Sequence, residues 1–133
     1  MQKVLVADSA NITHFVLERM LGKEGFKVFY VKYPRDLVAQ IRDIQPDILF
    51  LEPEISGGMG KKILEFLAGK VDISLPIILI TRMISDRTSM KKWPGVQGII
   101  HKPLNSEKVL EAIGALQLQE KPGDTDLSRE LAG

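Results

Sequence analysis

Four polar or charged residues of the sequence follow, or end, short apolar segments. They are Asp8 after VLVA (4–7), Glu52 after DILFL (47–51), Thr81 at the end of PIILIT (76–81) and Lys102 after GIIH (98–101). Two carboxylates, a hydroxyl and an ammonium that meet in one place can bind a phosphoryl group, hold a divalent cation or neutralise one another. Which chemistry applies depends on whether the fold brings the four side chains together.

The apolar segments are near-continuous rather than alternating, which favours strands buried on both faces of a parallel sheet. A fifth segment, KVFYVK (27–32), is more mixed and predicts an edge strand. Helical periodicity at residues 11–24, 34–44, 61–69 and 105–118 predicts helices between and after the strands. A further helix is expected at 85–92, although SDRTSMKK is polar. The order βαβαβαβαβα predicts an α/β fold, a (βα)5 doubly wound parallel sheet with the flavodoxin-like strand order 2-1-3-4-5.

The apolar periodicity also predicts which side of each helix faces the sheet. Gly25 is expected to stop the first helix, Pro34 to lie in the first turn of the second, and Asn105 or Ser106 to cap the last. The expected inward residues are Ile12, Phe15, Val16, Met20 and Leu21, then Leu37, Val38, Ile41 and Ile44, then Ile63, Leu64, Phe66 and Leu67, and finally Val109, Leu110, Ile113 and Leu116.

Sites in doubly wound sheets form beyond the carboxyl ends of the strands, so we expect the four polar residues to converge on one shallow crevice. The chain resembles the CheY-like receiver domain of two-component response regulators. The resemblance rests on KVLVADS (3–9), PDILFLE (46–52) followed by Gly60, LPIILIT (75–81) and GIIHKPL (98–104).

Receivers accept a phosphoryl group from a histidine kinase onto an aspartate that ends the third strand. The resemblance implies that Glu52 stands at that position and that Asp8 is one of the paired acids that hold magnesium. It also implies that Thr81 and Lys102 contact the phosphoryl oxygens, and that the bond between Lys102 and Pro103 is cis.

The sequence departs from this pattern at several positions. Ser9 stands where the second acid is expected; a one-residue shift would make Asp8 the second acid and Ala7 the first, but either way one carboxylate is missing. The usual Met-Pro of the loop after Glu52 is replaced by EISGG. Arg82 can neutralise the remaining negative charge, so we expect Mg²⁺ to bind weakly or not at all, and no other cofactor.

Glu52 itself replaces the aspartate, and its extra methylene moves the carboxylate outward by about 1.5 Å. Because misplacement by ~1 Å can cost on the order of 100-fold in rate, we expect Glu52 not to be phosphorylated. We expect it to pair with Lys102 and to accept a hydrogen bond from Thr81. Two interpretations stay open: a structural salt bridge that closes an inactive pocket, or a side chain that fills the phosphoryl position and holds an active-like conformation.

Ile99 stands where the resemblance places a switch aromatic. It has no polar tip to exchange burial for exposure, so we expect it to pack. Signalling through the face formed by residues 85–92, 98–101 and 105–118 is then constitutive, or another surface is used. A homodimer, if one forms, is expected to use the same face.

The composition limits other functions. The chain has 133 residues, a net charge of +1 and no cysteine, which excludes thiol chemistry. We expect one domain (1–118) and a polar tail (119–133) that is either flexible or the start of a linker. No apolar run approaches a membrane span or a signal peptide, so we expect a cytoplasmic location without membrane contact. The basic residues Arg82, Arg87 and KKW (91–93) lack interleaved aromatics, so nucleic acid is not an expected ligand.

The segment GGMGKK (57–62) resembles a nucleotide-binding loop but fails at two positions. Ser56 stands where glycine is needed, and Lys62 stands where Ser or Thr is needed, so we do not expect nucleotide binding.

The favoured function is a non-enzymatic, phosphorylation-independent receiver-like module that works through protein partners: a kinase, an output domain or another signalling protein. The alternatives are a phosphorylation-competent switch that uses Glu52 or a nearby side chain, and a small-molecule site in the crevice.

Overall fold

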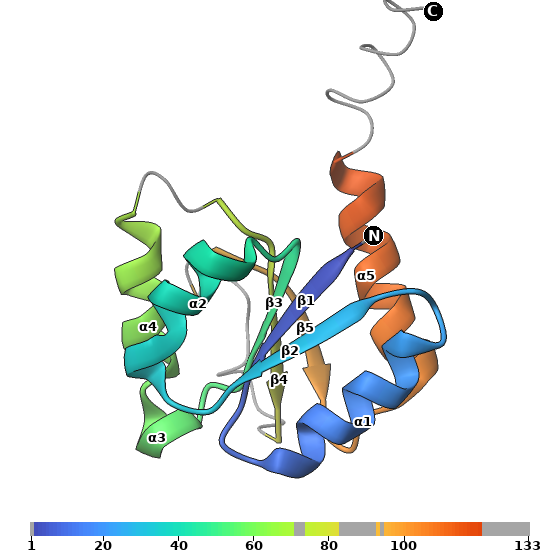
Figure 1. The fold of residues 1–133 in the computed structure, drawn as a ribbon, viewed down its shortest axis with the longest axis horizontal. Coiled ribbons are helices and arrows are strands. Elements are labelled where there is room, and N and C mark those ends of the chain that lie inside the picture. Colours follow the sequence, from blue (N-terminus) through green and yellow to red (C-terminus); the bar gives the residue numbers. More distant parts are fainter. Residues whose placement is uncertain (1, 71–73, 83–92, 94, 121–133) are drawn as a thin grey trace, which may run out of the picture.

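A computed structural model of the chain describes residues 2–70, 74–82, 93 and 95–120. They form a five-stranded parallel sheet in the order β2-β1-β3-β4-β5, which confirms the predicted fold class and strand order (Figure 1). The elements are β1 (Lys3–Ala7), α1 (Asn11–Gly22), β2 (Lys27–Val31), the 3-10 helix η1 (Pro34–Asp36), α2 (Leu37–Ile44), β3 (Ile48–Leu51), α3 (Ile55–Gly58), α4 (Gly60–Ala68), β4 (Ile77–Thr81), β5 (Val96–His101) and α5 (Ser106–Glu120).

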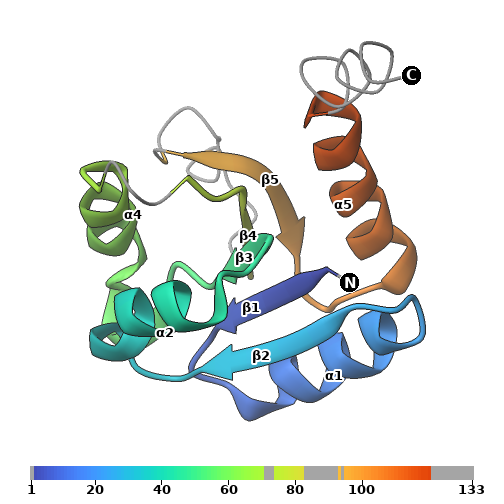
Figure 2. The same ribbon diagram turned by 45° about the horizontal axis from the view of Figure 1, so that its top comes forward.

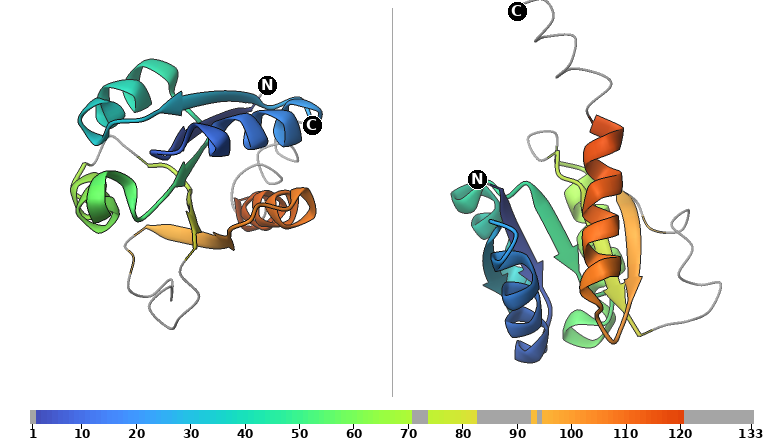
Figure 3. Two further views of the ribbon diagram at one scale, coloured as in Figure 1. Left: turned by 90° about the horizontal axis from the view of Figure 1, so that it is seen from below. Right: turned by 90° about the vertical axis from the view of Figure 1, so that its right-hand side faces the viewer.

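Helices cover both faces of the sheet, because alternate residues of a strand point to opposite sides. Figures 2 and 3 show α1 and α5 on one face and α2 and α4 on the other. The core under α2 and α4 includes Leu5 and Leu49, and the core under α1 and α5 includes Val6 and Phe50. All four are fully buried, which explains why the strands are apolar without alternation.

The parallel strands deliver the residues that follow them to one edge of the sheet. Their arrowheads point the same way in the right-hand view of Figure 3. Ala7 of β1 lies beside Leu51 of β3. The Glu52 N–H donates to the Ala7 carbonyl at 3.0 Å and the Lys102 N–H to the Thr81 carbonyl at 2.8 Å, so the pairing continues one residue past β3 and β5.

The face with which α1 packs corrects the sequence prediction. Ile12 and Phe15 do not face the core, since they are 66% and 59% exposed. Thr13, Leu17 and Leu21 are buried, at i, i+4 and i+8 of the same helix. Both sets of residues have helical spacing, so the periodicity alone does not choose between them; contact with the sheet decides.

The remaining helices pack largely as predicted, with one exception. Phe66 of α4 is 54% exposed, and the Lys70 ammonium lies 4.6 Å from the centre of its ring. An aromatic side chain covered by a lysine can stay at the surface, which the spacing of apolar residues does not reveal. The expected core residues that are buried are Leu37, Ile41, Ile63, Leu64, Leu67, Val109, Ile113 and Leu116.

The predicted ends of the helices are mostly confirmed. The Asn105 side chain caps α5 by accepting a hydrogen bond from the Lys108 N–H at 3.2 Å. Pro34 begins η1, directly before α2, and α1 ends three residues before Gly25, whose φ is +89°. The peptide bond between Lys102 and Pro103 is cis.

Two predicted segments are described in part or not at all. α5 continues to Glu120, beyond the predicted domain end at 118, and the tail from 121 to 133 lies outside the described residues. The predicted helix at 85–92 and the basic residue Arg87 also lie outside them. Among the helices that the structure describes, none combines the length and apolarity needed to cross a membrane.

Gly60 opens α4 at the turn that follows β3, where it contacts the backbone of Pro53. Its N–H donates to the Pro53 carbonyl at 3.0 Å. A Cβ at this position would lie 2.5 Å from Pro53 Cα and 2.7 Å from Pro53 O. Both atoms belong to the main chain, so a larger residue would have to move the segment that carries Glu52 and Glu54.

We predict that Gly60→Ala lowers the free energy of unfolding by about 1–3 kcal/mol, because the added methyl group overlaps backbone atoms. Gly114→Ala is the matched control, since outside the adjoining backbone of α5 no atom of another residue lies within 4 Å of its added Cβ. That change should raise stability by roughly 0.5–1 kcal/mol through helix propensity. Urea denaturation measures both, and equal effects of the two substitutions would contradict the close contact.

Candidate functional site

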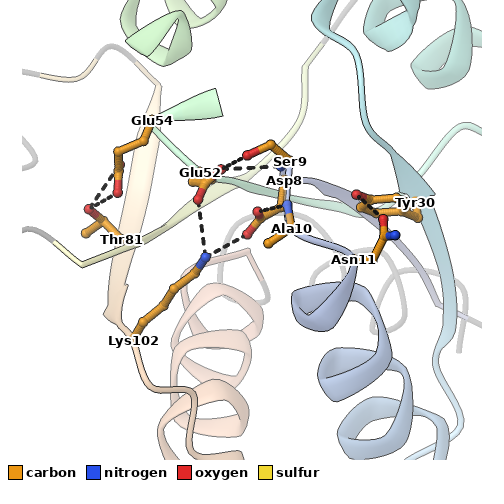
Figure 4. Close-up of polar contacts among 9 residues, drawn as sticks. All are labelled: Asp8, Ser9, Ala10, Asn11, Tyr30, Glu52, Glu54, Thr81 and Lys102. Atoms are coloured by element: carbon orange, nitrogen blue, oxygen red, sulfur yellow. Dashed lines mark hydrogen bonds and ion pairs between the residues drawn. The ribbon is translucent and has the colours of Figure 1, made fainter. Parts of the chain in front are cut away.

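Three of the four predicted side chains meet at the carboxyl edge of the sheet. The Lys102 ammonium lies 3.0 Å from Asp8 Oδ2 and 3.3 Å from Glu52 Oε2, so one cation bridges two carboxylates (Figure 4). The Asp8 side chain is fully buried, and the side chains of Glu52 and Lys102 are 9% and 11% exposed. The arrangement contains the ion pair expected between Glu52 and Lys102, and it adds Asp8 to that pair.

Further donors stabilise the two carboxylates, whose removal from water costs several kcal/mol per ion. The Ala10 N–H donates to Asp8 Oδ1 at 2.8 Å. The Ser9 N–H and hydroxyl donate to Glu52 Oε1 at 3.3 Å and 3.0 Å. Every oxygen of Asp8 and Glu52 therefore receives a donor, and in the described part of the chain no buried polar side-chain atom lacks a partner.

Ser9 has a defined role in this arrangement. It stands where the resemblance places a second acid, yet it contacts Glu52 through both its backbone and its hydroxyl. An acid at that position would repel the Glu52 carboxylate, whereas a hydroxyl donates a hydrogen bond to it. The serine at position 9 and the glutamate at position 52 thus fit each other chemically.

Thr81 contacts a carboxylate that the sequence analysis missed. We expected its hydroxyl to donate to Glu52; instead Thr81 Oγ1 lies 3.3 Å from both Oε1 and Oε2 of Glu54. Thr81 is fully buried at the end of β4, and Glu54 is half-buried in the turn between β3 and α3. The available signal was the second acid of LEPEI (51–55), at the same edge as Glu52.

Glu54 also adds a negative charge to the site. Asp8 and Glu52 contact Lys102 and Glu54 contacts Thr81, so these three acids exceed the charge of Lys102 by two, where Asp8 and Glu52 alone would exceed it by one. Arg82 is exposed and lies with Lys102 on the wall of a cavity of about 440 Å³ that also borders α1.

Ile99 lies on β5 and is half-buried. It packs against the core under α2 and α4, as expected for a residue without a polar tip. Trp93 packs against the same core and is also half-buried.

Tyr30 of β2 borders the acidic cluster. Its hydroxyl donates to Asn11 Oδ1 at 3.1 Å, and its ring stacks on His14 with a centroid distance of 4.8 Å. Burial raises the pKa of Tyr30 above its ordinary value of 10.0, and the negative charges of Asp8 and Glu52 raise the pKa further. The phenol therefore reports on the charge of the site.

The acids of the site are candidate ligands for a metal ion, which needs several of them grouped together. In the residues that the structure describes, no three His, Cys, Asp or Glu side chains are grouped so that they could hold a metal ion. Lys102 lies between the two buried carboxylates, where its positive charge offsets part of the negative charge that would attract Mg²⁺.

The fold and the site agree with a family assignment. The model of the response regulator receiver domain matches residues 4–114, which extend from β1 into α5. The chain belongs to the response regulator receiver domain family, the signalling modules of two-component systems.

Individual relatives support the same assignment. Protein PilH of Pseudomonas aeruginosa is 27% identical over 120 residues, covering 87% of this chain and 98% of PilH. The structure of a two-component response regulator from Clostridium difficile matches with a TM-score of 0.76 at 22% identity, over 90% of this chain and 98% of that chain. A receiver domain from Bermanella marisrubri matches with a TM-score of 0.75 at 20% identity, over 86% and 96%. At these identities the two structures show the fold.

We predict that Tyr30 ionises above pH 10 and that part of the shift comes from Glu52. In a Tyr33→Phe background, ultraviolet absorbance follows Tyr30 alone, and Glu52→Gln should lower its midpoint toward 10.0 because a negative charge is lost. Glu65→Gln, at an exposed position of α4, is the control and should leave the midpoint unchanged.

The raised pKa of Tyr30 also makes the stability of the fold depend on pH. Because this pKa is higher in the folded chain than in the unfolded chain, Tyr30 contributes its full share to the free energy of unfolding below pH 10. That share is lost as the pH rises through the pKa of the folded state. A Tyr30 midpoint at or below 10.0 would contradict the placement of the phenol beside two carboxylates.

Proposed function

We propose that this chain is a receiver module that signals through protein contacts without being phosphorylated at Glu52. The proposal rests above all on the contact of Lys102 with Asp8 at 3.0 Å and with Glu52 at 3.3 Å. In the receivers that this chain resembles, the lysine at this position contacts a phosphoryl oxygen. Here two carboxylates of the chain itself hold the ammonium.

The reactivity of Glu52 supports the same proposal. Its Oε2 contacts Lys102 and its Oε1 accepts two hydrogen bonds from Ser9, so both oxygens face donors rather than an incoming phosphoryl group. In-line phosphoryl transfer depends on positioning and on charge neutralisation. The longer side chain of Glu52 alters the position of the carboxylate. The ion pairs of Lys102 weaken the neutralisation of charge on an incoming phosphoryl group.

We also propose that Mg²⁺ binds weakly or not at all and is not a working cofactor. A receiver of the ordinary kind holds the ion with paired acids after its first strand, whereas here Asp8 is followed by Ser9. Asp8 accepts from Ala10 and Lys102, and an ion at this site would have to displace the ammonium. Such a displacement adds to the cost of dehydrating the ion.

The pocket is proposed to be closed by a structural salt bridge rather than held in an active-like state. Ile99 packs in the core, so it supplies no aromatic switch between β5 and the surface. The module would then be non-enzymatic and cytoplasmic, and would present one constant surface. Its partners would be a kinase, an output domain, another signalling protein or a second copy of the chain.

Phosphorylation chemistry tests the proposal directly. We predict that incubation with acetyl phosphate and Mg²⁺ leaves the intact mass unchanged, because Glu52 is held by Lys102 and Ser9. The mass is measured at neutral pH at several times, since acyl phosphates hydrolyse.

A mass increase of one phosphoryl group on the unaltered chain would contradict the proposal and favour a phosphorylation-competent switch. Glu52→Gln then serves as the control, because loss of the added mass in that variant would place the phosphoryl group on Glu52. A ligand that stays with the purified chain would instead indicate a small-molecule site.

A further inference from the structure

We propose that Glu54 is a second internal ligand of the site, which holds the Thr81 hydroxyl as Glu52 holds Lys102. In the receiver family these two groups, the hydroxyl and the ammonium, contact phosphoryl oxygens. This inference rests on the proposed function and deepens it, because it names the residue that keeps an external anion from Thr81.

The contacts divide between the two glutamates. Thr81 Oγ1 lies 3.3 Å from each carboxylate oxygen of Glu54, and Lys102 Nζ lies 3.3 Å from Glu52 Oε2. Figure 4 shows the two contacts side by side along the same edge. The segment Glu52-Pro53-Glu54 therefore supplies both anions from three consecutive residues.

The turn that carries Glu54 is fixed by the backbone. The Ile55 N–H donates to the Glu52 carbonyl at 3.1 Å, and the N–H groups of Gly57 and Gly58 donate to the Glu54 carbonyl at 3.2 Å. Ile55 is fully buried, and the close contact of Gly60 with Pro53 holds the other side of the turn. Glu54 is thus presented to Thr81 by a fixed segment of the chain.

Glu54 acts on the site in two ways. The Thr81 hydroxyl has one proton, and while it is donated to Glu54 it is not available to an external oxygen. The Glu54 carboxylate also adds a negative charge beside the position that an anion would need to occupy. Restoring an aspartate at position 52 and an acid at position 9 is therefore insufficient to make a working phosphoryl site.

The test uses beryllofluoride, a phosphoryl analogue that binds an aspartate in the presence of Mg²⁺. The parent carries Glu52→Asp with Ser9→Asp, and Glu54→Gln or Glu54→Ala is added to it. ¹⁹F NMR detects the bound analogue. We predict weak binding by the parent and at least tenfold tighter binding after either change at Glu54, whereas Glu65→Gln, an exposed site on α4, leaves it unchanged.

The outcomes separate this inference from the proposed function. Equal binding by the parent with and without Glu54, or no binding by any of these variants, would overturn the role of Glu54. A bound adduct on the unaltered chain would instead overturn the inactive pocket. Glu54→Gln removes only the negative charge, whereas Glu54→Ala removes the charge and the contact with Thr81. Comparing the affinity of the two variants for beryllofluoride therefore separates the two effects.

A second measurement needs no repaired site and so does not depend on the folding of the parent. Three-bond couplings from NMR report the side-chain rotamer of Thr81, which is fully buried. We expect the rotamer populations of Thr81 in Glu54→Ala to differ from those in the unaltered chain, and those in Glu65→Gln to be unchanged. An unchanged Thr81 rotamer in Glu54→Ala would overturn the proposal.

Discussion

The Lys102 ammonium is the charge on which the polar edge of this domain depends. Two carboxylates, Asp8 and Glu52, are withdrawn from water at the ends of β1 and β3, and they would repel each other without a cation between them. Lys102 reaches them from β5, two strands away from β3 in the sheet. The parallel fold makes this possible, because it ends its strands at one edge.

The same constraint explains why the unusual residues of the site occur together. A glutamate at position 52 extends far enough to meet Lys102 and Ser9 at once, and the serine supplies a donor where an acid would repel. Glu54 contacts the Thr81 hydroxyl at the same edge. Thr81 and Lys102, the two groups that the family resemblance assigns to phosphoryl oxygens, are thus both paired within the chain.

Much of the fold could be predicted from the sequence, because buried parallel strands are apolar without alternation and the strand order follows from few allowed topologies. The pairing of Glu52 with Lys102 could be predicted for the same reason, since both residues follow strands. The packed face of α1 could not, because Ile12 and Leu17 both fit a helical period. Glu54 could not either, since its contact depends on the turn around Pro53, which local spacing does not describe.

The most direct test of the account is a double-mutant cycle between Lys102 and Glu52. The free energies of unfolding of Lys102→Met, Glu52→Gln and the double variant are compared with that of the unaltered chain by urea denaturation at neutral pH. A direct ion pair with little exposure predicts a coupling energy of about 1–3 kcal/mol. Effects of the two substitutions that add to within about 0.3 kcal/mol would contradict the internal pairing on which the account rests.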